Sequence, residues 1–161
     1  MTDSDQRDAT YLRQAIDQSR AALQRGNRPY GAVLVGADGQ VLAEGQNTEQ
    51  SDRDITGHAE TNALREAYQR LGPAALAGST MYASGEPCPM CAATMFYSGV
   101  SRVIYAVSRA RARELSPRSQ GTPTLNITCR DILATSSRPI EVVGPKLEEE
   151  GAAVFVESAA R

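Results

Sequence analysis

Two short segments indicate both the fold and the chemistry of this chain: His58-Ala59-Glu60 and Pro87-Cys88-Pro89-Met90-Cys91, with 26 residues between them. Zinc prefers tetrahedral sites built from thiolate sulfur and imidazole nitrogen. Cys88 and Cys91 are three positions apart, so at the start of a helix both sulfurs can face one point. With His58 as the third ligand, one coordination position stays open, which is the arrangement of a catalytic zinc rather than a structural one.

The acidic residue of the first segment has a different predicted role. Glu60 lies two positions after His58, and on a regular helix these side chains point about 200° apart. They therefore do not both bind one metal from a regular turn. In the very first turn, however, His58 can reach the metal while Glu60 reaches past it to a bound water. We predict that Glu60 is a general acid/base and not a ligand.

Other interpretations of the two motif cysteines exist. Cys88 and Cys91 could form a redox pair, as C-x-x-C motifs do in some proteins, or belong to a structural zinc site. A structural site usually needs a fourth Cys or His, but His58 is the only histidine and Cys129 the only other cysteine. A lone histidine is more often a packed or surface residue than a ligand. The neighbouring motif outweighs that expectation here, so we favour a catalytic zinc and expect Cys129 to be a free thiol.

The motifs resemble those of a known superfamily. Four of them occur in order between about Pro29 and Val107: Pro29-Tyr30-Gly31-Ala32-Val33, Ala43-Glu44-Gly45-Gln46-Asn47, His58-Ala59-Glu60 and Glu86-Pro87-Cys88-Pro89-Met90-Cys91. Together they resemble the cytidine deaminase-like superfamily, and most closely its branch of bacterial guanine deaminase and tRNA adenosine deaminase. The resemblance implies an α/β fold, a three-layer α/β/α sandwich with a mixed five-stranded sheet, and one Zn²⁺ per chain. It also implies that Asn47 contacts the base or ribose of the substrate; alternatively, Asn47 only shapes its own loop as an Asx-turn residue.

The resemblance predicts hydrolytic deamination with release of ammonia, but it leaves the substrate open. We expect a small nucleobase or nucleoside, either a guanine-like purine or an aminopyrimidine. The tRNA enzymes usually continue after the fourth strand with an acidic residue and Lys-Thr-Gly, where this chain has Ser108-Arg109-Ala110-Arg111. Guanine deaminases have an aromatic-rich C-terminus, whereas residues 154–161 contain one aromatic. One alternative is tRNA adenosine-to-inosine deamination, and another is a non-catalytic zinc binding module, which would need no Glu60.

Size and composition are those of a globular protein. The 161 residues are 41% hydrophobic and 22% charged, which predicts one domain spanning residues 1–161 with a sizeable core. Three cysteines, two of them assigned to the metal, argue against a disulfide framework and for a reducing, cytoplasmic setting. The N-terminus is acidic and polar and lacks the pattern of a secretory signal, and no apolar run is long enough to cross a membrane. Residues 1–8 are expected to be disordered or frayed.

The charge pattern bears on possible partners. The net charge is −2, whereas a protein dominated by phosphate contacts is usually basic. Nucleic acid is therefore possible but not favoured. Four arginines, Arg109, Arg111, Arg113 and Arg118, form a locally basic segment. They are either a solvated face or a contact for an anionic substrate or nucleic acid. Family members often assemble, so the resemblance implies a homodimer or a higher homo-oligomer.

Hydrophobic periodicity predicts the order of the elements. We expect helices over residues 9–25, 58–71, 88–98, 109–115 and 145–160, with Pro145 at the start of the last one, although residues 154–156 could instead form a strand. Strands are expected over residues 32–35, 41–44, 80–83, 101–107 and 140–143. The first two form a hairpin, and the third and fourth are joined by a right-handed parallel crossover. Residues 48–57 and 116–127 are expected to be loops, and residues 128–133 fit a helical turn or a strand.

Overall fold

The computed structural model describes residues 1–161 and is built on a mixed sheet with the strand order β2-β1-β3-β4-β5. The strands are β1 (Gly31–Val35), β2 (Val41–Gln46), β3 (Thr80–Gly85), β4 (Arg102–Val107) and β5 (Glu141–Val143). β1 runs antiparallel to β2 and to β3, whereas β3, β4 and β5 are parallel. The expected five-stranded mixed sheet, its hairpin and its parallel crossover are therefore confirmed.

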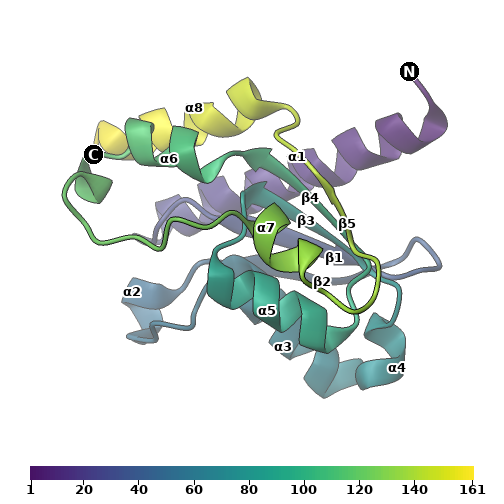
Figure 1. Ribbon diagram of the computed structural model, residues 1–161. Coiled ribbons are helices and arrows are strands. Elements are labelled where there is room, and N and C mark those ends of the chain that lie inside the picture. The colour runs from purple at the N-terminus through teal and green to yellow at the C-terminus, as the bar shows by residue number, and fades with distance from the viewer.

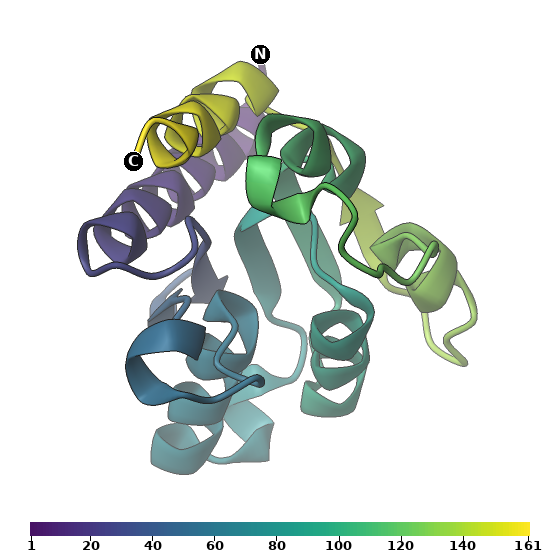
Figure 2. The ribbon, with the colours of Figure 1, turned by 90° about the vertical axis from the view of Figure 1, so that its left-hand side faces the viewer.

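Helices cover both faces of this sheet. They are α1 (Asp3–Gln24), α2 (Glu49–Asp52), α3 (Ala59–Leu71), α4 (Pro73–Leu76), α5 (Pro89–Ser98), α6 (Arg109–Leu115), α7 (Cys129–Ala134) and α8 (Glu148–Ala159). Figures 1 and 2 show α1, α6 and α8 on one face, with α3 and α5 on the other. This is the three-layer α/β/α sandwich that the motifs implied.

The interior strand β1 shows why two helical layers are needed. All five of its residues are buried, which is typical of a strand whose two faces are both covered. Ala32 and Leu34 pack into the core beneath α3 and α5. Val33 and Val35 pack on the opposite side with residues of α1 and α8. Alternate residues of one apolar run thus belong to two separate cores.

The N-terminal segment differs from the prediction. Residues 3–8, expected to be disordered, form the first turns of α1. Thr2 and Asp5 make a capping box that satisfies free N–H groups at the start of the helix. Burial raises the pKa of Asp8, but hydrogen bonds from Arg102 and Tyr82, both at 2.8 Å, outweigh it and leave that pKa below its ordinary value. These partners lie far along the chain, so the local sequence does not reveal them.

Two connections differ from expectation, and a third settles an open alternative. The polar loop at residues 48–57 contains the short helix α2, and the ambiguous segment 128–133 is helix α7, whose Thr128 side chain caps it. The last helix starts at Glu148 rather than at Pro145. The reason is that Lys146 still donates its N–H to the Tyr105 carbonyl, which keeps the chain beside β4, and Leu147 turns it with φ at 57°.

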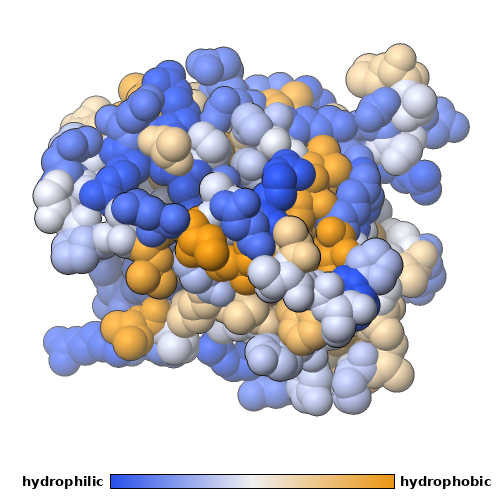
Figure 3. Space-filling model, viewed as in Figure 1, coloured by the Kyte–Doolittle hydropathy of each residue, from blue (hydrophilic) through white to orange (hydrophobic).

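The molecular surface is mixed in character. None of the helices is both long and apolar enough to cross a membrane. Figure 3 shows hydrophilic surface over α6 and hydrophobic surface near the middle of the same face, where α5, α7 and the loop before α7 come together. Leu125 and Ile127, both exposed, belong to that loop.

Candidate active site

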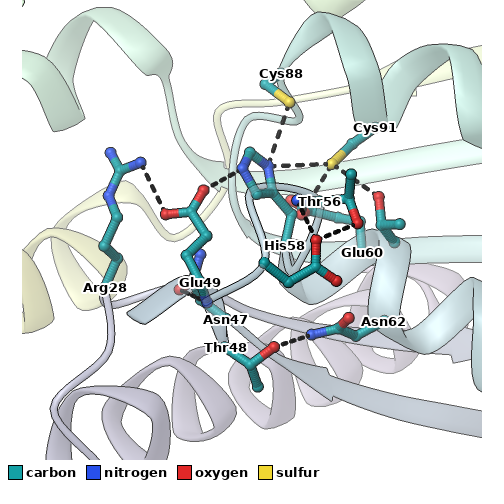
Figure 4. A network of polar contacts seen from close by, with 12 residues as sticks. Arg28, Asn47, Thr48, Glu49, Thr56, His58, Glu60, Asn62, Cys88 and Cys91 are labelled. Carbon is teal, nitrogen blue, oxygen red and sulfur yellow. Dashed lines mark hydrogen bonds and ion pairs between the residues drawn. The ribbon is translucent and has the colours of Figure 1, made fainter. Parts of the chain in front are cut away.

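The N-termini of α3 and α5 bring the two motif segments together. His58 is the N-cap of α3 and Cys88 is the N-cap of α5, both with extended backbone. The helix α5 begins at Pro89, one residue later than the predicted start at residue 88. At this first helical position the N–H that proline lacks would have no partner in any case. In Figure 4 the His58 ring lies between the two cysteines on one side and Glu49 on the other. The positive end of the α5 dipole also favours thiolates at this place.

The three predicted ligands have the spacing that zinc needs. The Nδ1 atom of His58 is 3.4 Å from the Cys88 sulfur and 3.5 Å from the Cys91 sulfur. A tetrahedral zinc with Zn–S of about 2.3 Å and Zn–N of about 2.0–2.1 Å places its nitrogen and sulfur ligands about 3.6 Å apart. All three ligand atoms lie within 4.8 Å of one another. The donor set and its geometry therefore fit a zinc ion with one position open. Cys129 is a free, buried thiol outside this cluster.

Glu60 lies beside the ligand cluster without belonging to it. Its side chain is buried, and its Oε2 atom is 3.5 Å from the Cys91 sulfur. Burial raises the pKa of Glu60 to about 7. A carboxyl group whose pKa lies near the working pH is well suited to take up and release protons.

Residues 5–107, well over half of the chain, match the cytidine and deoxycytidylate deaminase zinc-binding region. The chain belongs to this deaminase family. The matched range contains His58, Glu60, Cys88 and Cys91. The predictions of a zinc-dependent deaminase and of its zinc cofactor are thereby confirmed.

Relatives of this deaminase differ in the base on which they act. A probable cytosine deaminase of Schizosaccharomyces pombe is 38% identical over 149 residues, covering 92% of this chain and 90% of the relative. A tRNA-specific adenosine deaminase of Bacillus subtilis is 37% identical over 98 residues, covering 61% of this chain and 60% of the relative. The guanine deaminase of Nitrosomonas europaea shares the fold, with a TM-score of 0.79 at 23% identity over 94% of this chain and 84% of that one.

Sequence reasoning missed one residue of the deaminase site. Glu49, in the first turn of α2, contacts the Nε2 atom of His58 through its Oε1 atom. Its other carboxylate oxygen is 3.5 Å from the Arg28 guanidinium. A metal-bound histidine commonly donates its second ring N–H to a carboxylate, which fixes the tautomer and the ring orientation. The sequence placed Glu49 in a polar loop, and only its position two residues after Asn47 could have drawn attention to it.

We expect Glu49→Ala to weaken zinc binding about 10- to 100-fold, because loss of such an outer carboxylate frees the ligand histidine to rotate. Glu49→Gln should keep part of the affinity, since the amide oxygen can still accept from Nε2. Chelator competition measures the affinity directly. Glu66→Ala is the matched control, because Glu66 is exposed on α3 and pairs only with Arg70. Equal affinities of Glu49→Ala and the control would show that Glu49 does not orient His58.

The protonation of the ligands gives zinc binding a defined pH dependence. Without metal, hydrogen bonds to Cys88 and Glu49 raise the pKa of His58 to about 10. The hydrogen bond between Cys91 and Cys88 raises the pKa of Cys91 above its ordinary value. Hydrogen bonds from Cys91 and from His58, of which the first has the larger effect, lower the pKa of Cys88 to about 4. Near pH 8 the Cys88 thiolate is therefore already formed, whereas His58 and Cys91 still carry their protons.

We expect zinc binding at pH 8 to release about two protons, one each from His58 and Cys91, because the metal binds neutral imidazole and thiolate. At this pH Glu60, with a pKa of about 7, is already ionised. The affinity should therefore rise with pH, about 100-fold from pH 8 to pH 9, at two protons per ion. Titration calorimetry in two buffers with different ionisation enthalpies counts the protons. Release of none would contradict this assignment.

Asn47 lies in the turn that leads into α2. It is buried, and its Oδ1 atom accepts a hydrogen bond from the Glu49 amide at 3.1 Å. The local Asx-type turn is therefore present. This turn holds Glu49 at the start of α2 and so contributes to the contact with His58. Asn47 also lines the cavity beside the ligands.

The ligand cluster opens into a cavity of about 760 Å³. Glu60, Asn47 and Glu86 line it together with α6 and the loop that leads to α7. Arg109 donates hydrogen bonds to the carbonyls of Leu125 and Ile127 at 3.2 and 2.7 Å. These bonds hold the loop against α6, and the loop and the helix together form one wall of the cavity.

Two arginines of the basic segment, Arg109 and Arg113, hold the loop in place. Arg113 donates to the Thr122 carbonyl at 2.7 Å, which adds a second tie between α6 and the same loop. Arg111 makes an exposed ion pair with Glu114 instead. The sequence could not distinguish these roles, because the partners of Arg109 and Arg113 are backbone carbonyls.

Proposed function

We propose that this deaminase removes the exocyclic amine of a small nucleobase or nucleoside, a guanine-like purine or an aminopyrimidine, and releases ammonia. The observation that carries the proposal is the position of buried Glu60 beside the ligand set of His58, Cys88 and Cys91. Glu60, His58 and Cys88 line one cavity of about 760 Å³, and Cys91 is fully buried behind them. Pockets for small ligands commonly measure about 300–1,000 Å³, so a base or a nucleoside fits.

Each residue has a chemical task in this proposal. His58, Cys88 and Cys91 would hold zinc, which makes water acidic enough to supply hydroxide near neutral pH. Glu60 accepts the proton that water loses and passes it to the ring nitrogen next to the attacked carbon. It then takes the proton of the newly formed hydroxyl group on that carbon and supplies it to the departing amine, so the product carries a carbonyl. One C–O bond forms and one C–N bond breaks, so that one water is consumed for each ammonia released.

Asn47 is proposed to orient the substrate. Its Oδ1 atom is engaged with the Glu49 amide, but its Nδ2 amide can still donate to a carbonyl or a ring nitrogen of a base. Because the same turn also positions Glu49, Asn47 would couple substrate placement to the geometry of His58.

Two observations support a small substrate over the tRNA alternative. The probable cytosine deaminase aligns along nearly the whole chain, whereas the tRNA-specific adenosine deaminase aligns along 61% of it. The arginines Arg109 and Arg113 that face the cavity already donate to backbone carbonyls. A non-catalytic zinc module is disfavoured by Glu60, because a structural site gains nothing from burying an extra carboxyl group beside its ligands.

A substrate panel tests the proposal. The zinc-loaded protein is incubated with cytosine, guanine, adenine, their nucleosides and tRNA, and released ammonia is measured together with inosine in the tRNA. We expect ammonia from at least one base or nucleoside and no inosine in tRNA. Inosine formed in tRNA alone would replace this proposal with the tRNA alternative.

A further inference from the structure

The cavity contains a phenol group that the proposed chemistry does not use. Tyr30 immediately precedes β1 and lines the cavity together with Glu60 and Asn47. The backbone N–H of Asn47 donates to the Tyr30 carbonyl at 3.0 Å, which holds the two residues side by side. Tyr30 therefore lies next to the residue that is proposed to orient the substrate.

The ring of Tyr30 is held in place by its neighbours. It packs edge-on against the ring of Phe155 on α8, with the two planes at 78° and the centroids 5.3 Å apart. The guanidinium carbon of Arg28 lies 5.3 Å from the Tyr30 ring centroid. Gly85, the last residue of β3, leaves room for the ring, because a Cβ atom there would come within 2.8 Å of Tyr30 Cε1. A ring fixed by packing presents its hydroxyl at a defined point, as a group that recognises a substrate must.

The hydroxyl of Tyr30 is free to bind a ligand. It makes no hydrogen bond to another residue of the protein. The side-chain oxygens that are both fully buried and without a hydrogen-bond partner belong to three other residues, Gln46, Ser79 and Glu86. The Tyr30 hydroxyl is not among them, so it keeps accessible surface that a molecule in the cavity can contact.

The electrostatic surroundings of Tyr30 keep this hydroxyl protonated. Burial raises the pKa of Tyr30 above its ordinary value, and the nearby charge of Glu60 adds to the rise, although Arg28 offsets part of it. Near neutral pH the group is therefore a neutral phenol with one O–H to donate. The partner that it lacks within the protein is an acceptor on the ligand.

The chemistry of the proposed substrates supplies such an acceptor. In cytosine and in guanine, the carbon that carries the exocyclic amine is followed by a ring nitrogen and then by a carbonyl carbon. In adenine, the corresponding carbon carries a hydrogen instead. Glu60 is proposed to protonate that ring nitrogen, and Tyr30 lines the same cavity close to Glu60. A donor at this place suits the carbonyl that follows the ring nitrogen.

We propose that the Tyr30 hydroxyl donates a hydrogen bond to this ring carbonyl and thereby makes the enzyme favour oxo bases such as cytosine and guanine over adenine. This inference rests on the proposed function and narrows its substrate class. A site that pairs a protein donor with a substrate acceptor disfavours analogues that lack the acceptor, because the donor is then left unpaired. Tyr30 is a specificity-determining residue in this proposal, and Glu60 keeps the proton transfers.

The test uses Tyr30→Phe, which removes the hydroxyl but keeps the ring that packs against Phe155 and Gly85. Each base is compared with an analogue that lacks the carbonyl: cytosine with 4-aminopyrimidine and guanine with 2-aminopurine. For the base that the wild-type enzyme converts, Tyr30→Phe should lower kcat/KM about 3- to 10-fold, the effect of losing one neutral hydrogen bond. The value for the analogue should not change. An analogue that is not converted is compared through its inhibition constant instead.

The matched control is Tyr97→Phe, because Tyr97 is 82% exposed on α5 and does not line the cavity. It should equal the wild type on every compound. Zinc content is measured on all three proteins, so that a loss of metal is not mistaken for a loss of recognition.

The outcomes separate this inference from the proposed function. If the wild-type enzyme converts no base or nucleoside, the proposed function itself fails. If it converts one but Tyr30→Phe equals the wild type, or slows the base and its analogue equally, the hydroxyl does not bind the carbonyl and only this inference fails. Conversion of adenine by the wild-type enzyme as efficiently as cytosine or guanine would also overturn it.

Discussion

Replacing Glu60 with alanine should abolish turnover while leaving the zinc in place. Glu60 both accepts and delivers protons in the proposed reaction, and a positioned acid/base contributes about 100- to 10,000-fold to a rate. Since the same group serves successive proton transfers, we expect kcat to fall at least about 1,000-fold. Glu60 lies outside the ligand cluster of His58, Cys88 and Cys91, so the metal content should remain one zinc per chain. Ammonia release and metal analysis on the same preparation measure both quantities.

The matched control for this change is Glu66→Ala on the same helix, because Glu66 is exposed and remote from the cavity. It should retain wild-type kcat and zinc content. Near wild-type turnover of Glu60→Ala would refute the role of Glu60. Loss of zinc together with turnover would instead make Glu60 part of the metal site, contrary to the geometry described above.

Replacing Cys91 with alanine should remove both metal and activity. Cys91 is fully buried, and its sulfur is 3.5 Å from His58 Nδ1, so alanine at this position removes one of the three ligand atoms from the cluster. With only His58 and Cys88 left, zinc content should fall from one per chain to close to zero, and turnover should fall below detection. Metal binding to a folded site also stabilises the fold, so the melting temperature of the wild-type protein should drop on chelation while that of Cys91→Ala should not respond.

Cys129→Ala is the control for this experiment, because Cys129 is an equally buried cysteine that takes no part in the ligand cluster. It should keep one zinc per chain and most of the activity. A Cys91→Ala protein that retains stoichiometric zinc would exclude the proposed ligand set. Zinc lost from Cys129→Ala but not from Cys91→Ala would reassign the third ligand.

Several features of the site follow from short-range sequence rules. Cys88 and Cys91 are three positions apart at a helix start, which places both sulfurs on one side of the first turn. Pro89 fits that turn because it has no N–H to leave unsatisfied. The uniformly apolar run in β1 indicates a strand with both faces covered. Each of these conclusions depends on residues within a few positions of one another.

Other features depend on residues that are distant in the sequence. Asp8 is ordered because Arg102 and Tyr82 are its partners, and nothing near Asp8 in the sequence indicates them. Glu49 reaches His58 only because the loop between β2 and α3 folds back over the ring. The sequence left Arg109 open between a solvated face and an anion contact, but its guanidinium donates to backbone carbonyls that carry no sequence signal.

The sequence by itself predicted the ligand set, the acid/base role of Glu60, the hairpin, the parallel crossover and the reaction class. It could do so because metal coordination and backbone periodicity restrict residue types at fixed spacings. Only the tertiary structure decided that Glu49 holds His58 and that the Tyr30 hydroxyl lies at the cavity without a partner. Whether a polar atom is satisfied depends on every neighbour that packs around it, and those neighbours come from strands and helices far apart in the chain.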